Sequence, residues 1–159
     1  MGIKGYFIGL FFLAPIIFFI HELGHAFFGK LCGYKLAKIE IGTGKAVFKI
    51  GLIEFKSVYF LGGHYYAENK IDNILGQMLM VFGGAIFNFF IIFICVLLLH
   101  NGVLRSHWLL HAFINFNAYI GIAALLPIQY FQRGKSDGQR IYYIIKHLYS
   151  RRKSKNTDQ

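Results

Sequence analysis

Three long apolar segments dominate the pattern of hydrophobic and polar positions along the chain. They cover about residues 6–28, 76–99 and 108–129, and most charged side chains lie between or after them. A helix of about 20 mostly apolar residues is long enough to cross the roughly 30 Å hydrocarbon core of a bilayer. The pattern therefore predicts an all-α polytopic membrane protein with three core transmembrane helices.

The segment between the first two apolar runs has the period of β-strands. Residues 38–41 and 53–56 alternate polar and apolar side chains, residues 46–50 are rich in strand formers, and glycines such as Gly51 separate them. We expect two or three short antiparallel strands, a membrane-associated β-hairpin region at the membrane surface. This region is either a simple connector or an exposed edge that captures an extended substrate by strand addition.

The pattern after the third apolar segment is polar and basic. Residues 140–149 are amphipathic and are expected to lie in the membrane interface. Residues 151–159 are expected to form a basic, disordered C-terminal tail. The length of the chain suits one domain, which we assign to residues 1–150.

Composition and charge favour a membrane protein over a nucleic-acid-binding one. The chain is 56% hydrophobic and has a formal net charge of +10. Its basic residues gather in two blocks, 30–70 and 133–155, and are not interleaved with aromatic residues on one face. Basic loops beside apolar spans lie on the cytoplasmic side and attract anionic lipid. We expect a multi-pass protein of a bacterial cell membrane, N-terminus outside and C-terminus cytoplasmic, with lipid but no nucleic acid as a partner.

The first apolar segment contains the sequence His-Glu-x-x-His. His21 and His25 are four residues apart, so on a helix their rings lie about 40° apart around the axis and can reach one metal ion. Glu22 projects beside them and can act as a general base on metal-activated water. Ionisable side chains inside hydrocarbon are costly, which makes this cluster a functional-site hypothesis.

Catalytic zinc usually has three protein ligands, and a carboxylate would complete the two imidazoles. With three spans, the histidines and Asp137 fall at the cytoplasmic ends of the first and third spans, and therefore at the same depth. Asp137 is thus the best placed of the acidic residues, although an Asp-Gly pair is also an ordinary turn. The predicted cofactor is Zn²⁺.

Two further residues within the apolar segments, an asparagine and a proline, each allow two interpretations. Asn88 is the only strongly polar residue inside the second span, and it either bonds another helix or faces the active cavity. Pro15 lies before the metal motif, where it either kinks the helix and admits water or is simply tolerated.

These motifs resemble the site-2 protease family of intramembrane zinc metalloproteases over about residues 15–141. The His-Glu-x-x-His of residues 21–25 matches the family's first-helix motif, which implies that both histidines bind zinc and that Glu22 is catalytic. Leu-Leu-Pro at 125–127 followed by Asp-Gly resembles the family's Asn-Leu-Leu-Pro…Asp-Gly element and implies Asp137 as the third ligand.

The sequence departs from the family pattern at three places. Gly-Gly-Ala-Ile-Phe-Asn ending at Asn88 is similar to the family's Gly-Pro-x-x-Asn segment, with Ala85 departing from the proline. Ala124 occupies the position of the motif's asparagine, and the spacing to Asp137 is longer than in the compact family form. Asn117 could take the place of the missing asparagine, so Asn88 and Asn117 are the expected substrate-binding residues.

We expect an intramembrane zinc endopeptidase that cuts membrane-spanning or membrane-associated peptides. The resemblance implies substrates such as membrane-tethered regulators, signal-peptide remnants or peptide precursors, and a homo-oligomer is left open. The main alternative is a catalytically inactive, protease-like membrane protein that binds a peptide partner in an immunity or chaperone role. A metal transporter is a third interpretation, but it would spread its ligands over several helices at mid-depth.

Overall fold

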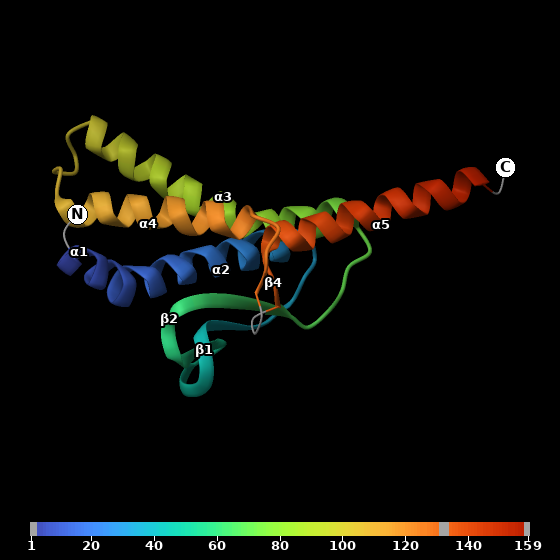
Figure 1. The fold of residues 1–159 in the computed structure, drawn as a ribbon, viewed down its shortest axis with the longest axis horizontal. Coiled ribbons are helices and arrows are strands. Elements are labelled where there is room, and N and C mark those ends of the chain that lie inside the picture. The colour runs from blue at the N-terminus through green and yellow to red at the C-terminus, as the bar shows by residue number, and fades with distance from the viewer. Residues whose placement is uncertain (1–2, 131–133, 158–159) are drawn as a thin grey trace.

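Three long helices lie side by side in the computed structural model, which describes residues 3–130 and 134–157 (Figure 1). By length and composition, the stretches Gly9–Leu31, Ile74–His100 and Trp108–Leu125 can each cross a membrane. They confirm the three predicted spans. The elements are α1 (Ile3–Ile8), the π-helix η1 (Gly9–Leu13), α2 (Ala14–Leu31), β1 (Leu36–Ile50), β2 (Ile53–Ala67), α3 (Ile74–His100), α4 (Trp108–Leu125), β3 (Gln129–Tyr130), β4 (Gly134–Lys135) and α5 (Asp137–Thr157).

Proline changes the backbone of the first span without ending it. Pro15 lies in the first turn of α2 and has no N–H to donate. The preceding turn, Gly9–Leu13, is π-helical, and the Ala14 N–H bonds the Gly9 carbonyl five residues back. The disturbance expected at Pro15 is therefore a local widening of the helix.

The other two spans differ from their predicted bounds for local reasons. Helix α3 begins at Ile74, where the Asn73 side chain accepts a hydrogen bond from the Leu75 N–H at 3.1 Å. Helix α4 ends at Leu125, four residues before the predicted end, because Leu126 precedes Pro127 and has extended angles, φ −69° and ψ 136°.

The β region is larger than predicted. Instead of two or three short strands, the structure has one antiparallel hairpin of two 15-residue strands, β1 and β2, which turns at Gly51. The description all-α therefore fits the spans but not this region. Gly42 has φ +92°, and a Cβ there would lie 2.4 Å from the Tyr59 Cα, so the two strands bend against each other at a position that requires glycine.

The hairpin packs along the first span, on the side opposite α4 (Figure 1). Ile39, Ile41 and Tyr65 form a buried cluster against side chains of α2 and α3. Farther along, the Phe60 ring lies edge-on to Phe11, with ring centroids 4.6 Å apart. The hairpin thus extends beside the apolar helix and brings β2 to the motif at residues 21–25.

Helices α2 and α3 touch through glycine. A Cβ on Gly24 would lie 2.2 Å from the Gly83 carbonyl oxygen, and a Cβ on Gly83 would lie 2.5 Å from that of Gly24. The two backbones are therefore in direct contact at this crossing, as small residues allow in membrane helices. The contact is one residue from His25 and one from Gly84.

Helix α5 continues away from the bundle along its long axis (Figure 1). The amphipathic segment predicted at 140–149 lies within this helix, which the structure describes to Thr157. The division of the chain into a domain at 1–150 and a tail at 151–159 stays a prediction.

Charged side chains pair across the hairpin. The Lys38 and Lys56 ammonium groups lie 2.5 and 3.1 Å from Glu40 Oε1, and Lys56 also pairs with Glu54. Burial raises the pKa of Glu40, but the two ammonium groups lower it further, so this pKa lies below its ordinary value.

A methyl group at the α2–α3 crossing should destabilise the protein. Gly83→Ala should lower the free energy of unfolding by about 1–3 kcal/mol, because neither backbone can yield without separating the helices. Gly121→Ala is the matched control, since its Cβ would come no closer than 3.3 Å to a neighbour. SDS-induced unfolding measures both, and an equal loss in the two variants would contradict the close crossing.

Acid should loosen the hairpin. Because the folded-state pKa of Glu40 is depressed, its ion pairs stabilise the hairpin above the unfolded-state pKa of about 4.3 and are lost as the pH falls through the folded-state value. Protection factors of the β1 and β2 amides, measured by hydrogen exchange, should therefore fall below about pH 4. Glu40→Gln removes the titrating group and should flatten this dependence; an identical pH profile would refute the assignment.

Candidate metal centre

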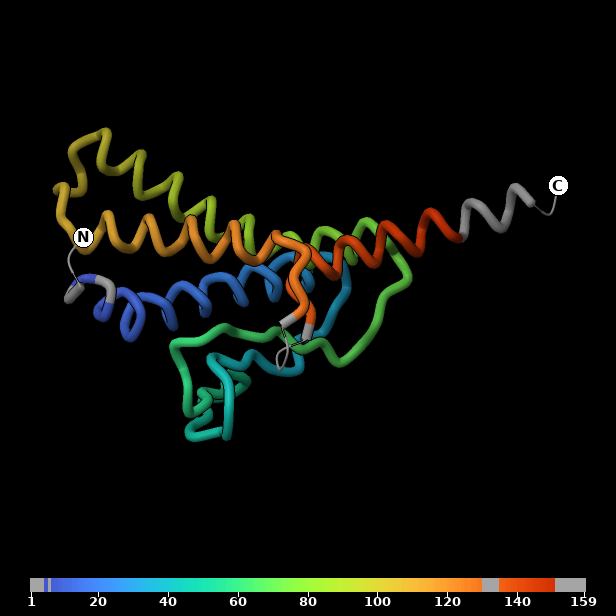
Figure 2. Tube along the Cα trace, in the orientation of Figure 1, coloured from blue at the N-terminus to red at the C-terminus, as the bar shows by residue number. Residues whose placement is uncertain are grey.

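Two histidines of α2 and the first residue of α5 meet at one point. His21 Nε2 lies 2.9 Å from Asp137 Oδ2, and His25 Nε2 lies 3.2 Å from both of these atoms. The three residues are 3–8% exposed. Figure 2 shows how the chain returns after α4 so that the start of α5 lies beside α2. The structure thus brings the three predicted metal ligands together.

The donor set fits a tetrahedral metal. In a tetrahedral zinc site with bonds of about 2.0–2.1 Å, neighbouring donors are roughly 3.4 Å apart. The observed separations of 2.9, 3.2 and 3.2 Å come close to the three edges of one such face. Two imidazoles and one carboxylate are also donors that zinc accepts. These side chains could therefore hold a metal ion together.

A hydrogen bond orients the His25 ring so that Nε2, the nitrogen that could bind a metal, faces His21 and Asp137. Its Nδ1–H donates to the Met80 carbonyl at 2.8 Å, because a carbonyl oxygen can only accept. This bond fixes the tautomer and leaves the Nε2 lone pair free for a ligand. Burial raises the pKa of Asp137, but His25 and His21 lower it further, so the carboxylate stays ionised at neutral pH.

The long segment between Pro127 and Asp137 contains a small two-stranded ribbon. Strands β3 and β4 pair antiparallel, and the Ser136 N–H donates to the Ile128 carbonyl at 3.0 Å. Ser136 Oγ donates to the Leu126 carbonyl at 2.6 Å and accepts from the Gln139 N–H at the start of α5. These bonds hold the described ends of the ribbon together, so the start of α5 lies beside the end of α4.

Two glycines make room for the motif. A Cβ on Gly84 of α3 would lie 2.5 Å from His21 Nε2, and a Cβ on Gly63 of β2 would lie 2.7 Å from Glu22 Oε1. The His21 ring and the Glu22 carboxylate each lie directly on backbone. Any larger residue at either glycine would displace the side chain that it contacts.

A cavity of about 410 Å³ opens onto this centre. Glu22, which is 4% exposed, lines it together with both histidines and Asp137. The apolar part of the wall comes from four elements: η1, α2, β2 and α4. It includes Leu10, Phe18, Phe60, Leu61, Phe116 and Ile120. A mostly apolar cavity with a few ionisable groups in its wall is typical of a ligand-binding site.

The two predicted substrate-binding asparagines lie elsewhere. Asn88 and Asn117 are both fully buried, and neither lines the cavity. Asn88 Nδ2 donates to the Asn117 carbonyl at 3.5 Å, and Asn117 Nδ2 donates to the Phe113 carbonyl at 2.9 Å. Of the two interpretations of Asn88, the structure shows bonding to another helix, and a substrate contact stays a prediction for both residues.

The cavity wall also contains polar residues that the sequence motifs do not indicate. His64 of β2 and Arg140 of α5 line the cavity, with Arg140 Nη2 3.1 Å from His64 Nε2. The sequence feature that points to Arg140 is its position three residues after Asp137, which places both residues on the same face of a helix. For His64 it is the preceding Gly-Gly pair, which permits close approach to α2.

Comparison with known proteins identifies the family of this chain. The chain is 37% identical over 134 residues to the "Uncharacterized membrane protein YwmF" of Bacillus subtilis (strain 168), which covers 84% of each chain. It is 32% identical over 98 residues to a "Putative zinc metalloprotease" of Helicobacter pylori (strain J99), covering 48% of this chain but 28% of that protein. The sequence model of the family described as Peptidase family M50 matches residues 8–148. Because this match covers most of the chain and confirms the resemblance found in the motifs, the protein belongs to peptidase family M50, the site-2 protease family.

Proposed function

We propose that the protein is an intramembrane zinc endopeptidase that hydrolyses membrane-spanning or membrane-associated peptides. The observation that carries the proposal is the convergence of His21, His25 and Asp137 within 3.2 Å, in the wall of a mostly apolar cavity that Glu22 also lines. Membership of a peptidase family and the three apolar helices support it.

His21 Nε2, His25 Nε2 and Asp137 Oδ2 would hold the ion. When bound, zinc supplies a Lewis acid that polarises a carbonyl group and lowers the pKa of water. Asp137 offers an ionised carboxylate, and the bond to Met80 orients the His25 ring so that Nε2 faces the other two ligands.

Glu22 would carry the proton. Its carboxylate accepts a proton from the water whose oxygen bonds to the carbonyl carbon of the substrate. As the carbon–nitrogen bond breaks, Glu22 delivers that proton to the leaving nitrogen. The backbone of Gly63 holds the carboxylate in place, because its missing Cβ leaves space for Glu22 Oε1.

The hairpin would present the substrate. Strand β2 pairs with β1 along one edge, and residues 60–65 of β2 line the cavity. Residues 63–65 of β2 pair with β1 along one edge only. An extended peptide can add to the other edge of this segment through backbone hydrogen bonds. Proteolysis inside a helix-rich membrane requires an extended substrate, so this edge is our candidate docking strand.

The proposed topology follows from the charge of the loops. The basic block 30–70 connects the end of α2 to the start of α3, and the basic block 133–155 follows the end of α4 in the sequence. We assign both blocks to the cytoplasm of a bacterial cell and the N-terminus to the outside. The metal centre would then lie toward the cytoplasmic face.

Replacing the proposed proton carrier should abolish cleavage. Glu22→Gln keeps the size of the side chain but cannot accept the proton, so turnover of a co-expressed single-span substrate should fall at least about 10²-fold. Immunoblots of the tagged fragments measure it, with Glu68→Gln, an exposed carboxylate, as the matched control. Unchanged cleavage in E22Q would refute the mechanism, and no cleavage in the wild type would favour the peptide-binding alternative.

Removing the third ligand should remove the metal. Purified wild-type protein should contain zinc at one ion per chain, whereas Asp137→Ala should be nearly metal-free because two imidazoles alone leave the site incomplete. Asp72→Ala changes an exposed carboxylate and should retain zinc. Mass spectrometry of the metal content decides, and full zinc occupancy in D137A would contradict the assignment of Asp137.

A further inference from the structure

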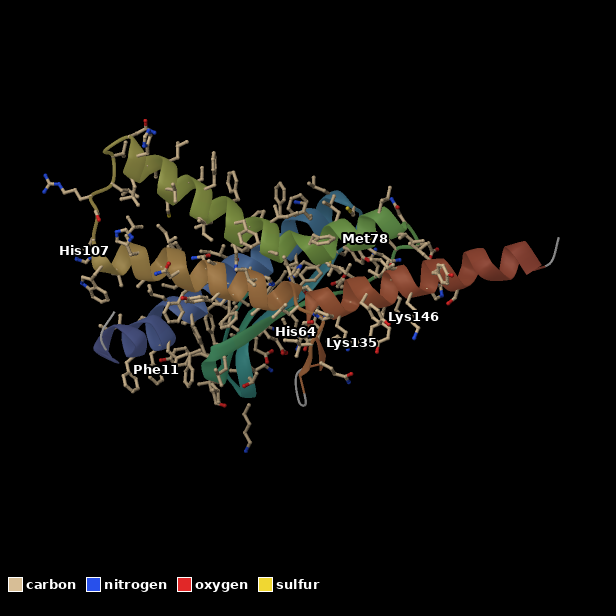
Figure 3. The ribbon with its side chains drawn as sticks, turned by 45° about the horizontal axis from the view of Figure 1, so that its top comes forward. Phe11, His64, Met78, His107, Lys135 and Lys146 are labelled. Carbon is tan, nitrogen blue, oxygen red and sulfur yellow. The ribbon has the colours of Figure 1, made fainter. Side chains whose placement is uncertain are left out.

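Arg140 places a cation in the wall of the catalytic cavity. It lies on α5 one turn after Asp137, and its Nη2 is 3.1 Å from Nε2 of His64 (Figure 3 labels His64 near the start of α5). Both side chains line the same cavity as Glu22 and the metal group. Neither side chain takes part in metal binding or in the proton transfer by Glu22.

The contact with His64 orients the guanidinium without neutralising it. His64 Nδ1 lies 3.2 Å from the Gly63 carbonyl and must donate to it, so Nε2 is left to accept from Arg140. Burial and the nearby Arg140 charge lower the pKa of His64, which keeps the ring neutral. Within residues 3–130 and 134–157, no carboxylate lies within the 4.0 Å of an ion pair with Arg140. Its positive charge therefore stays available to the cavity.

The position of this charge suits the reaction. Gly63 packs against the Glu22 carboxylate, and its carbonyl accepts the hydrogen bond from His64 Nδ1. Arg140 bonds the other ring nitrogen of His64, so two adjacent residues of β2 separate Arg140 from the proton carrier. Attack on a peptide carbonyl drives negative charge onto its oxygen, and preorganised donors at that oxygen are often the largest catalytic contribution.

Three other polar side chains of the cavity are occupied or badly placed. Ser136 Oγ already donates to the Leu126 carbonyl, and the Lys135 ammonium lies 3.8 Å above the Tyr143 ring. The Tyr65 hydroxyl lies against Gly29, one turn past His25. Ala124, where the family motif has asparagine, lines the cavity but has no donor.

We propose that Arg140 is a catalytic residue that stabilises the negative charge on the carbonyl oxygen of the scissile bond, and that His64 is its positioning residue. This inference rests on the proposed peptidase function. As the water oxygen bonds to the carbonyl carbon, the carbonyl π pair moves onto oxygen, and Arg140 N–H groups donate hydrogen bonds to it. The guanidinium keeps its protons throughout. The pair returns when the carbon–nitrogen bond breaks and the nitrogen takes the proton held by Glu22.

Steady-state kinetics on the single-span substrate test this role. Arg140→Gln should lower kcat by about 10²–10³-fold, the usual effect of losing one such donor, with KM and zinc content unchanged. Arg140→Lys keeps the charge and should recover part of the loss. Lys146→Gln removes an exposed cation two turns farther along α5 (labelled in Figure 3) and should match the wild type.

A transition-state mimic separates catalysis from folding. A phosphinic pseudopeptide of the cleaved sequence carries an anionic tetrahedral centre, so R140Q should raise its Ki by the same factor by which it lowers kcat/KM. His64→Gln places an acceptor near the position of Nε2 and should stay active, whereas His64→Phe should fall toward R140Q.

Three results would overturn the role of Arg140: an unchanged kcat in R140Q, a rise in KM alone, or a loss of zinc and thermal stability that explains the defect. Cleavage that is sensitive to E22Q but survives R140Q would refute this inference alone. Cleavage that survives E22Q would refute the peptidase mechanism and this inference with it.

Discussion

The burial of two imidazoles and one carboxylate against each other is the interaction on which this structure depends. His21 and Asp137 are 116 positions apart in the chain, yet their donor atoms are 2.9 Å apart and shielded from solvent. Ionisable groups taken out of water need a partner or a metal, because burial of an unpaired charge costs several kcal/mol. The packing of α2, α3 and α5 therefore has to hold three side chains at one point.

Glycines allow this close packing at three contacts. The Gly24–Gly83 crossing brings α3 against α2, Gly84 accommodates the His21 ring, and Gly63 brings β2 against Glu22. Each contact is between a backbone and a functional side chain, or between two backbones. The apolar helices thus provide the membrane-compatible frame, while the hairpin and the ribbon before α5 deliver the groups that complete the cavity.

Much of this could be predicted from the sequence, because some signals are local. The three spans are continuous apolar runs, the His-Glu-x-x-His motif fixes its own geometry on a helix, and the depth argument selected Asp137. The length of the hairpin was underestimated because residues 57–63 lack clear alternation. Contacts between distant segments, such as Arg140 with His64 and Gly84 with His21, produce no periodic pattern in the sequence. They follow only from the three-dimensional packing.

The proposed function requires that one ion is bound by two imidazoles and one carboxylate. Zinc K-edge X-ray absorption of the purified protein measures the coordination directly. We expect four nitrogen or oxygen donors, two of them imidazoles, with zinc–nitrogen distances of about 2.0–2.1 Å. A spectrum showing zinc–sulfur bonds near about 2.3 Å, or a single imidazole, would contradict it, because the ion would then lie outside the site formed by His21, His25 and Asp137.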